Sequence, residues 1–258
     1  MPFFYQGIRA ALMCATLALV AVASASGASD LDGQVAPAAA LSLPTSADLG
    51  YRTTATMKLM GLPVTLHGRT TIRWRLDDGH YETRLHIDTG GFDQFSRGQL
   101  AADGALVPER YEEKRPLHEP DFVDIDWAHG HIAYGASVPA QSPAAGAQDR
   151  LSLQFELARE LQRFPERFPS GSVHAVNLIG THSVDAWNFL TQDDQSVDTG
   201  RGPMRAVRFS ARRIVRNNVE ETMEIWLGAD LRWLPVRIRI VDREGSIIDS
   251  VLADAVLP

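Results

Sequence analysis

The sequence places two acidic and two imidazole side chains close together, at Asp124, Asp126, His129 and His131. Carboxylate oxygens and imidazole nitrogens are ligands that divalent transition metals accept. The two aspartates alternate with apolar residues, which is the pattern of a strand with one solvent-exposed face. The same residues therefore also fit the polar turn of a hairpin, and we expect that turn and no metal site.

Nucleophilic catalysis would need a serine placed beside a histidine and an acid. Ser183 directly follows His182, but the sequence has no G-x-S-x-G turn to expose a nucleophile. Neighbouring residues of a strand point to opposite faces, so the paired acids at 112–113, 193–194 and 220–221 do not predict a carboxylate dyad. A P-loop and a dinucleotide fingerprint are also missing. We expect no catalytic residues and no cofactor, with a hydrolase at His182 and Ser183, or at the turn from Asp124 to His131, as an alternative.

Arginines recur on what would be the polar faces of several strands, at Arg73, Arg75, Arg84, Arg237 and Arg239. Gathered on one face, their guanidinium groups could bind an anionic head group, because the planar fork matches phosphate and carboxylate. The alternative is a solvated face on which they pair with acids of the same strands, namely Glu82, Asp88 and Asp249. We expect the paired, solvated face.

The bulk composition narrows the classes of protein. The chain has 258 residues, 45% of them hydrophobic, which is enough for a sizeable core in one large domain or two small ones. Its 25 Lys and Arg against 32 Asp and Glu give a net charge of -7. Proteins that bind nucleic acid usually present a basic surface, so this balance predicts no nucleic acid partner.

Residues 1–28 have the organisation of a cleavable secretory signal peptide. Arg9 precedes an apolar run over 10–23 that is too short to span a bilayer comfortably. Ala23-Ser24-Ala25 and Ser26-Gly27-Ala28 both fit the cleavage pattern of small residues. An uncleaved anchor is the alternative. We expect a periplasmic protein that does not span the membrane after cleavage. The only cysteine, Cys14, lies in this segment, so the mature chain would contain no disulfide.

After a flexible tether over residues 29–48, residues 49–258 are expected to form one domain in which strand patterns dominate. Only one helix is expected. Asp149 would cap it, apolar residues recur at helical spacing over 153–164, and Pro165 would end it. The fold class is therefore mainly β: a curved antiparallel sheet or partly closed β-barrel with one packed α-helix.

Two hairpins predict which residues face the core. Asp78-Gly79 is a strong signal for a two-residue turn, which would pair Trp74 with Thr83 on an apolar face and leave Arg75 on the other. A three-residue loop ending at Gly245 would likewise give the last hairpin one apolar face and one polar face. A slip of one residue would turn the apolar side chains outward, so the register is well specified.

Four stretches run in an order that resembles the DUF3108 family: "RGQLAADGALVPERYEEKR", "QDRLSLQFELARELQRFP", "VDTGRGPMRAVRF" and "IWLGADLRWLPVRIRIVDREGSIIDSVL". The similarity covers residues 49–252, and its motifs are structural. The resemblance implies an exported bacterial protein of uncharacterised function, with a curved sheet partly closed around a helix. That outline is similar to the lipoprotein carriers of the LolA and LolB type, which bind acyl chains in an apolar hollow. The family offers no catalytic residues to transfer.

Together these features favour a non-enzymatic protein of the periplasm that binds an apolar or amphipathic envelope ligand, such as a lipid. The ligand would sit inside the curved sheet and contact Trp74, Leu85, Ile238 and Ile248. An alternative is a structural or interaction protein with a solid core, whose surface docks another envelope protein.

Overall fold

The computed structural model describes residues 43–59, 62–89, 91–135, 139–214, 220–242 and 244–258. These residues all belong to one compact unit, Ala40–Pro258. The expected signal peptide and most of the expected tether lie outside the described residues. Strand β1 begins at Ser46, and Leu43 is buried in the core, so the ordered domain starts earlier than residue 49.

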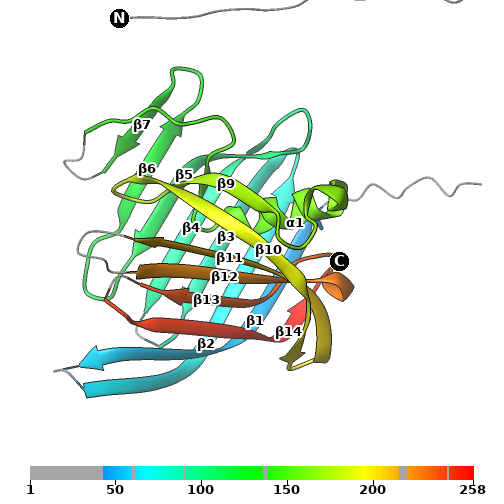
Figure 1. Cartoon of the computed structure of the whole chain (residues 1–258). Helices are drawn as coiled ribbons and strands as arrows, with labels where there is room; N and C mark the ends of the chain where they lie inside the picture. Colours follow the sequence, from blue (N-terminus) through cyan, green and yellow to red (C-terminus); the bar gives the residue numbers. More distant parts are fainter. Residues whose placement is uncertain (1–42, 60–61, 90, 136–138, 215–219, 243) are drawn as a thin grey trace, which may run out of the picture. The chain divides into compact units, whose positions relative to one another are not determined.

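The described strands form one large curved sheet (Figure 1). They are β1 (Ser46–Leu59), β2 (Leu62–Asp77), β3 (His80–Ile87), β4 (Phe92–Leu100), β5 (Leu106–Lys114), β6 (Asp121–Asp126), β7 (His131–Tyr134), β8 (Gln148–Asp149), β9 (Val173–Ile179), β10 (Val184–Thr199), β11 (Gly202–Ile214), β12 (Glu220–Gly228), β13 (Pro235–Val241) and β14 (Ile247–Val256). Their order is β7-β6-β5-β4-β3-β2-β1-β14-β13-β12-β11-β10-β9-β8. Every neighbouring pair is antiparallel except β8 and β9, which are parallel. The sheet is not closed into a barrel, and the predicted fold class is confirmed.

The β2–β3 hairpin has the register that the Asp78-Gly79 turn predicts. Trp74 lies opposite Thr83, and Arg75 opposite Glu82. Trp74 and Thr83 are fully buried, whereas Arg75 is exposed. The alternation of apolar and polar residues therefore sets which side of the sheet faces the core.

The β13–β14 hairpin also follows its predicted register. Ile238 lies opposite Ser250, and Arg239 lies opposite Asp249 on the other face. Gly245 adopts a φ of 78°, in the left-handed region that glycine occupies without a steric penalty.

A single α-helix among the described residues, α1 (Leu153–Arg163), packs into the curve of the sheet (Figure 1). Its apolar stripe is buried, and the Phe155 ring stacks on Trp74 with 4.5 Å between centroids. The helix ends at Arg163, before Pro165, as the sequence predicts. No helix among the described residues has both the length and the apolar character needed to cross a membrane.

A second cluster brings the two ends of the sheet together. Tyr111, Val123 and Ile132, from β5, β6 and β7, pack with Leu151 and with Ile179 of β9. The sheet therefore curls until strands β5 to β7 share a small core with β9.

Asp149 links these two ends of the sheet through hydrogen bonds. The prediction that it caps the helix is wrong. The N-cap position belongs to Ser152, and Asp149 instead accepts the backbone N–H groups of Leu151 and Ser152, each at 2.8 Å, in the preceding turn. Its other oxygen accepts the Ser96 hydroxyl of β4 at 2.5 Å. Burial raises the pKa of Asp149, against the opposing effect of the hydrogen bonds that its carboxyl accepts.

This pKa predicts how stability depends on pH. The folded state binds the Asp149 proton more tightly than the unfolded chain does, so this carboxyl should destabilise the fold as pH rises above about 4, the ordinary value for Asp. Asp149→Asn should remove that part of the pH dependence, as measured by urea unfolding between pH 4 and 8. The exposed Asp126 is the control: a hydrogen bond from His129 lowers its pKa, so this carboxyl is ionised in both the folded and the unfolded state above about pH 4, and Asp126→Asn should leave the slope between pH 4 and 8 unchanged. Equal slopes for the wild type and Asp149→Asn would contradict this role.

Candidate functional site

We define the inner face of the sheet as the face that carries Trp74 and Leu252. Its side chains are buried at one end of the strands and become partly exposed toward the other end. On β13, Val236 is fully buried while Ile238 and Ile240 are half-buried. On β14, Leu252 is fully buried while Ile248 is half-buried. The helix covers the first end, and the second end, toward the hairpin tips, is partly open.

The strand register places the apolar residues of this open end opposite one another, in one row across the sheet. Leu66 of β2 pairs with Ala55 of β1, and Ala55 pairs with Ile248 of β14. Ile248 pairs with Ile240 of β13, which pairs with Met223 of β12. Opposite residues of a sheet share a face. We call these five residues the apolar row; its exposure is greatest at Leu66, which is 37% exposed, and least at Met223, at 5%.

A polar hollow of about 470 Å³ lies beside the apolar row. It is lined by Glu113, Arg115, Arg150, Gly180, Thr181, His182, Ser183, Glu221, Asp242 and Glu244. Glu221 lies two positions before Met223 on β12, and Asp242 lies two positions after Ile240, just beyond β13, so both continue the inner face toward the tips. The open end thus presents an apolar floor next to a polar rim, and we call it the mouth.

The most buried acidic residue of the rim is Glu113, which is 6% exposed. It accepts hydrogen bonds from the Tyr111 hydroxyl at 2.9 Å, from Gln94 at 3.1 Å and from Thr181 at 3.3 Å. Burial raises the pKa of Tyr111 well above its usual value, so its hydroxyl stays protonated and keeps donating. Arg115 adds an ion pair at 3.6 Å. These bonds satisfy the buried charge without any ligand.

Among the described residues, Arg150 is a rim cation without an ion-pair partner. Its side chain reaches the turn between β9 and β10, where its guanidinium lies near Gly180. It is half-buried, and its positive charge lowers the pKa of the nearby Tyr111 against the larger effect of burial. No acidic side chain within the described ranges lies at ion-pair distance from it. A donor is therefore available at the edge of the mouth.

The four residues predicted to bind a ligand divide between the two ends. Ile238 and Ile248 lie on the partly open part of the inner face. Leu85 is half-buried and packs against both core clusters. Trp74 lies at the closed end, where it is fully buried and donates its indole N–H to the Pro44 carbonyl at 2.7 Å. Ligand binding by these residues stays a prediction, but Trp74 is enclosed by side chains of the protein.

Three of the four candidate metal ligands have ion-pair partners, and two of them pair with each other. Asp124 pairs with Arg110 at 2.8 Å, and Asp126 pairs with His129 at 2.7 Å. Within the part of the chain that the structure describes, no three His, Cys, Asp or Glu residues are grouped so as to hold a metal ion. The four residues lie in and beside the turn that joins β6 to β7.

The hydrolase candidates line the rim but do not form a nucleophile–base pair. The Ser183 hydroxyl donates to Asp185 at 2.9 Å, whereas the His182 ring bonds to Thr181. A base must lie within hydrogen-bond reach of the nucleophile that it activates, and His182 is instead engaged by its other neighbour.

Most of the arginines on the outer face, which is the opposite side of the sheet, have acidic partners. The ion pairs are Arg75–Asp48, Arg84–Glu82, Arg237–Asp249 and Arg239–Glu224. The predicted paired face is therefore confirmed for these four residues, with Asp48 and Glu224 as partners that the sequence did not single out. Asp88 accepts the backbone N–H of Arg69 instead.

A family model described as "Protein of unknown function (DUF3108)" matches residues 51–251. The chain belongs to the DUF3108 family. The match begins in β1 and ends in β14, so this DUF3108 protein carries the helix, the inner face and the mouth within the matched region. None of the curated proteins compared with it matches the sequence.

Solved structures share the architecture at low sequence identity. The chain is similar to a β-barrel-like protein of the domain of unknown function DUF1849 from Brucella abortus, with 12% identity over 83% of this chain and 98% of that one and a TM-score of 0.55. A DUF1329 family protein from Desulfovibrio piger has 10% identity over 84% and 87% of the two chains, with a TM-score of 0.26. A putative outer membrane lipoprotein-sorting protein domain from Vibrio parahaemolyticus has 8% identity over 84% and 88%, also with 0.26. The DUF1849 likeness shows the fold alone, and the last two are too weak to carry an argument.

The difference between the two ends of the inner face predicts different costs of truncation. Leu252→Ala at the closed end should lower the free energy of unfolding by about 3 kcal/mol, because it leaves a cavity in a packed core. Ile248→Ala on the same strand and face should lower it by about 1 kcal/mol, because Ile248 is only half-buried. Urea unfolding of the two variants measures both values. Equal losses would contradict the open mouth.

Proposed function

We propose that this DUF3108 protein is an exported periplasmic protein that binds an amphipathic ligand of the cell envelope in the mouth, without catalysing a reaction. The observation that carries the proposal is the partly exposed apolar row next to a polar hollow. An apolar surface that stays partly exposed in a folded monomer often marks a binding site. The signal-peptide pattern of residues 1–28 supports the location.

The chemistry of the mouth favours an amphipathic ligand over a fully apolar one. Ile248 and Ile240 offer aliphatic surface that a hydrocarbon chain would cover, at about 25 cal/mol for each Å² removed from water. The rim next to them carries hydroxyl, carboxylate and guanidinium groups. The N–H groups of the Arg150 guanidinium have no acidic partner among the described residues. A ligand with a hydrocarbon body and a polar head would match both surfaces at once.

The arrangement of the rim favours binding without chemistry. Glu113 is saturated by hydrogen bonds, and Ser183 and His182 each bond to a different neighbour. A catalytic site would keep a nucleophile and its base in reach of one another. The rim groups instead form a fixed polar border around the apolar row.

Binding can be tested with N-phenyl-1-naphthylamine, an apolar dye whose fluorescence rises when it leaves water. We expect saturable binding to the wild type, and a loss of affinity of about tenfold or more in Ile248→Asp, because an unpaired carboxylate would be buried under the dye. Val256→Asp is the matched control, since Val256 lies on the same strand and is 67% exposed away from the mouth. It should bind as the wild type does.

Two results would contradict the proposal. One is a wild-type protein that shows no saturable dye binding, which would favour the alternative of an interaction protein with a solid core. The other is equal loss in Ile248→Asp and Val256→Asp, which would place the dye elsewhere on the surface.

A further inference from the structure

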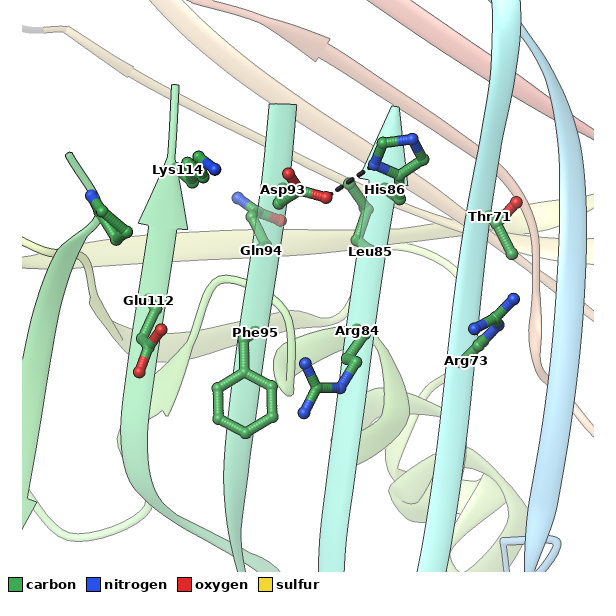
Figure 2. Close-up of a pocket in the computed structure, with 11 residues that line it drawn as sticks. Thr71, Arg73, Arg84, Leu85, His86, Asp93, Gln94, Phe95, Glu112 and Lys114 are labelled. Carbon is green, nitrogen blue, oxygen red and sulfur yellow. Dashed lines mark hydrogen bonds and ion pairs between the residues drawn. The ribbon is translucent and has the colours of Figure 1, made fainter. Parts of the chain in front are cut away.

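The outer face of the sheet carries a second hollow, of about 390 Å³, across β2, β3, β4 and β5 (Figure 2). It is lined by Thr71, Arg73, Arg84, Leu85, His86, Asp93, Gln94, Phe95, Glu112, Lys114 and Pro120. The strand register explains how residues distant in sequence reach one place. The hollow lies on the opposite side of the sheet from the apolar row, so it is a separate feature of the fold.

Two rows of opposite residues form the floor of this hollow. In the first row, Arg73 lies opposite Arg84, Arg84 opposite Phe95, and Phe95 opposite Glu112. The Arg84 guanidinium lies 4.5 Å from the centroid of the Phe95 ring, and Figure 2 shows it extending toward that ring. Two arginines directly opposite each other repel, so the fold keeps this pair at some cost.

The second row runs beside the first and ends in a lysine. Thr71 lies opposite His86, His86 opposite Asp93, and Asp93 opposite Lys114. His86 and Asp93 are joined at 2.7 Å (Figure 2). Strands β2 and β5 are three spacings apart, about 14 Å. Arg73 and Lys114 also stand two residues apart along the strands, so about 16 Å separates their backbones. The long side chains of both residues can extend toward a ligand between them.

The acids that line the hollow are already engaged. Glu112 pairs with Arg110 at 2.6 Å, and Asp93 pairs with His86. Arg84 pairs with Glu82 at 2.8 Å. Within the described ranges, no acidic side chain lies at ion-pair distance from Arg73 or Lys114. Three cations, Arg73, Arg84 and Lys114, against two acids, Glu112 and Asp93, give the lining a net charge of +1 with neutral histidine, on a chain whose net charge is -7.

We propose that this hollow binds an anionic group, a phosphate or a carboxylate, held between Arg73 and Lys114 and beside the Phe95 ring. A guanidinium offers two parallel donors that match such an anion, and an ammonium adds a point charge from the other side. Phe95 is half-buried, and its ring supplies an apolar surface for the body of the ligand. The bound anion pairs with Arg73 and Lys114, which have no acidic partner among the described residues.

The anionic group can belong to a soluble molecule or to a lipid head group. Glycerol-3-phosphate serves as the soluble probe, and vesicles of phosphatidylglycerol in phosphatidylcholine present the same group on a lipid surface. Calorimetry measures the first and co-flotation the second, both at low ionic strength, because the lining is exposed and salt screens it.

The test compares three single variants in the full chain. Arg73→Gln and Lys114→Gln should each weaken binding about tenfold, because each loses a charge-assisted hydrogen bond. Arg52→Gln is the control: Arg52 is exposed on the outer face of β1 and lies outside this hollow. It removes the same charge and should leave binding unchanged. Circular dichroism verifies that all three remain folded.

Binding of glycerol-3-phosphate with this pattern supports a soluble ligand, and binding of anionic vesicles alone with the same pattern supports a head group. The proposal is overturned if neither probe binds the wild type, or if Arg52→Gln weakens binding as much as Arg73→Gln does. The latter result would mean that only the general charge of the surface matters.

Discussion

The length of helix α1 is the constraint on which the mouth depends. An α-helix of 11 residues is about 16 Å long, whereas a strand of 16 residues, such as β2, is about 53 Å long. One short helix cannot cover the inner face of such strands. It packs at one end, with Phe155 stacked on Trp74, and leaves the other end to partly exposed aliphatic residues.

Polar contacts hold the curled sheet in the shape that this division requires. Asp149 links the approach to the helix with Ser96 of β4, and Glu113 of β5 is bonded to Thr181 in the turn between β9 and β10. Both carboxylates are buried, so each hydrogen bond replaces solvation that the folded state has removed. The apolar floor of the mouth is thereby held next to a polar rim, while the outer face keeps most of its charges in pairs.

Much of the fold could be predicted from the sequence, because local rules decide it. The Asp78-Gly79 turn and the alternation around Trp74 set the β2–β3 register, and Pro165 set the end of the helix. Long-range contacts could not be read in this way. The parallel pairing of β8 with β9 depends on the approach of two distant segments, as does the use of Asp149 as a link to Ser96.

The candidate site was predictable only as a face of the sheet. Alternation identified Ile238 and Ile248 as inner residues, but it could not say where along the strands the helix stops covering them. Trp74 shares their face and yet lies under Phe155. The unpaired state of Arg73 was also hidden, because an ion pair depends on which strands become neighbours.

The most direct test of the account is the reactivity of single cysteines on β13, in a chain whose own Cys14 is replaced by serine. The account predicts that a thiol in Ile240→Cys reacts rapidly with iodoacetamide in the folded protein. A thiol in Val236→Cys, four positions away on the same face, should react only after unfolding, because Val236 is fully buried. Equal protection of the two thiols would contradict an inner face that is closed at the helix and open at the mouth.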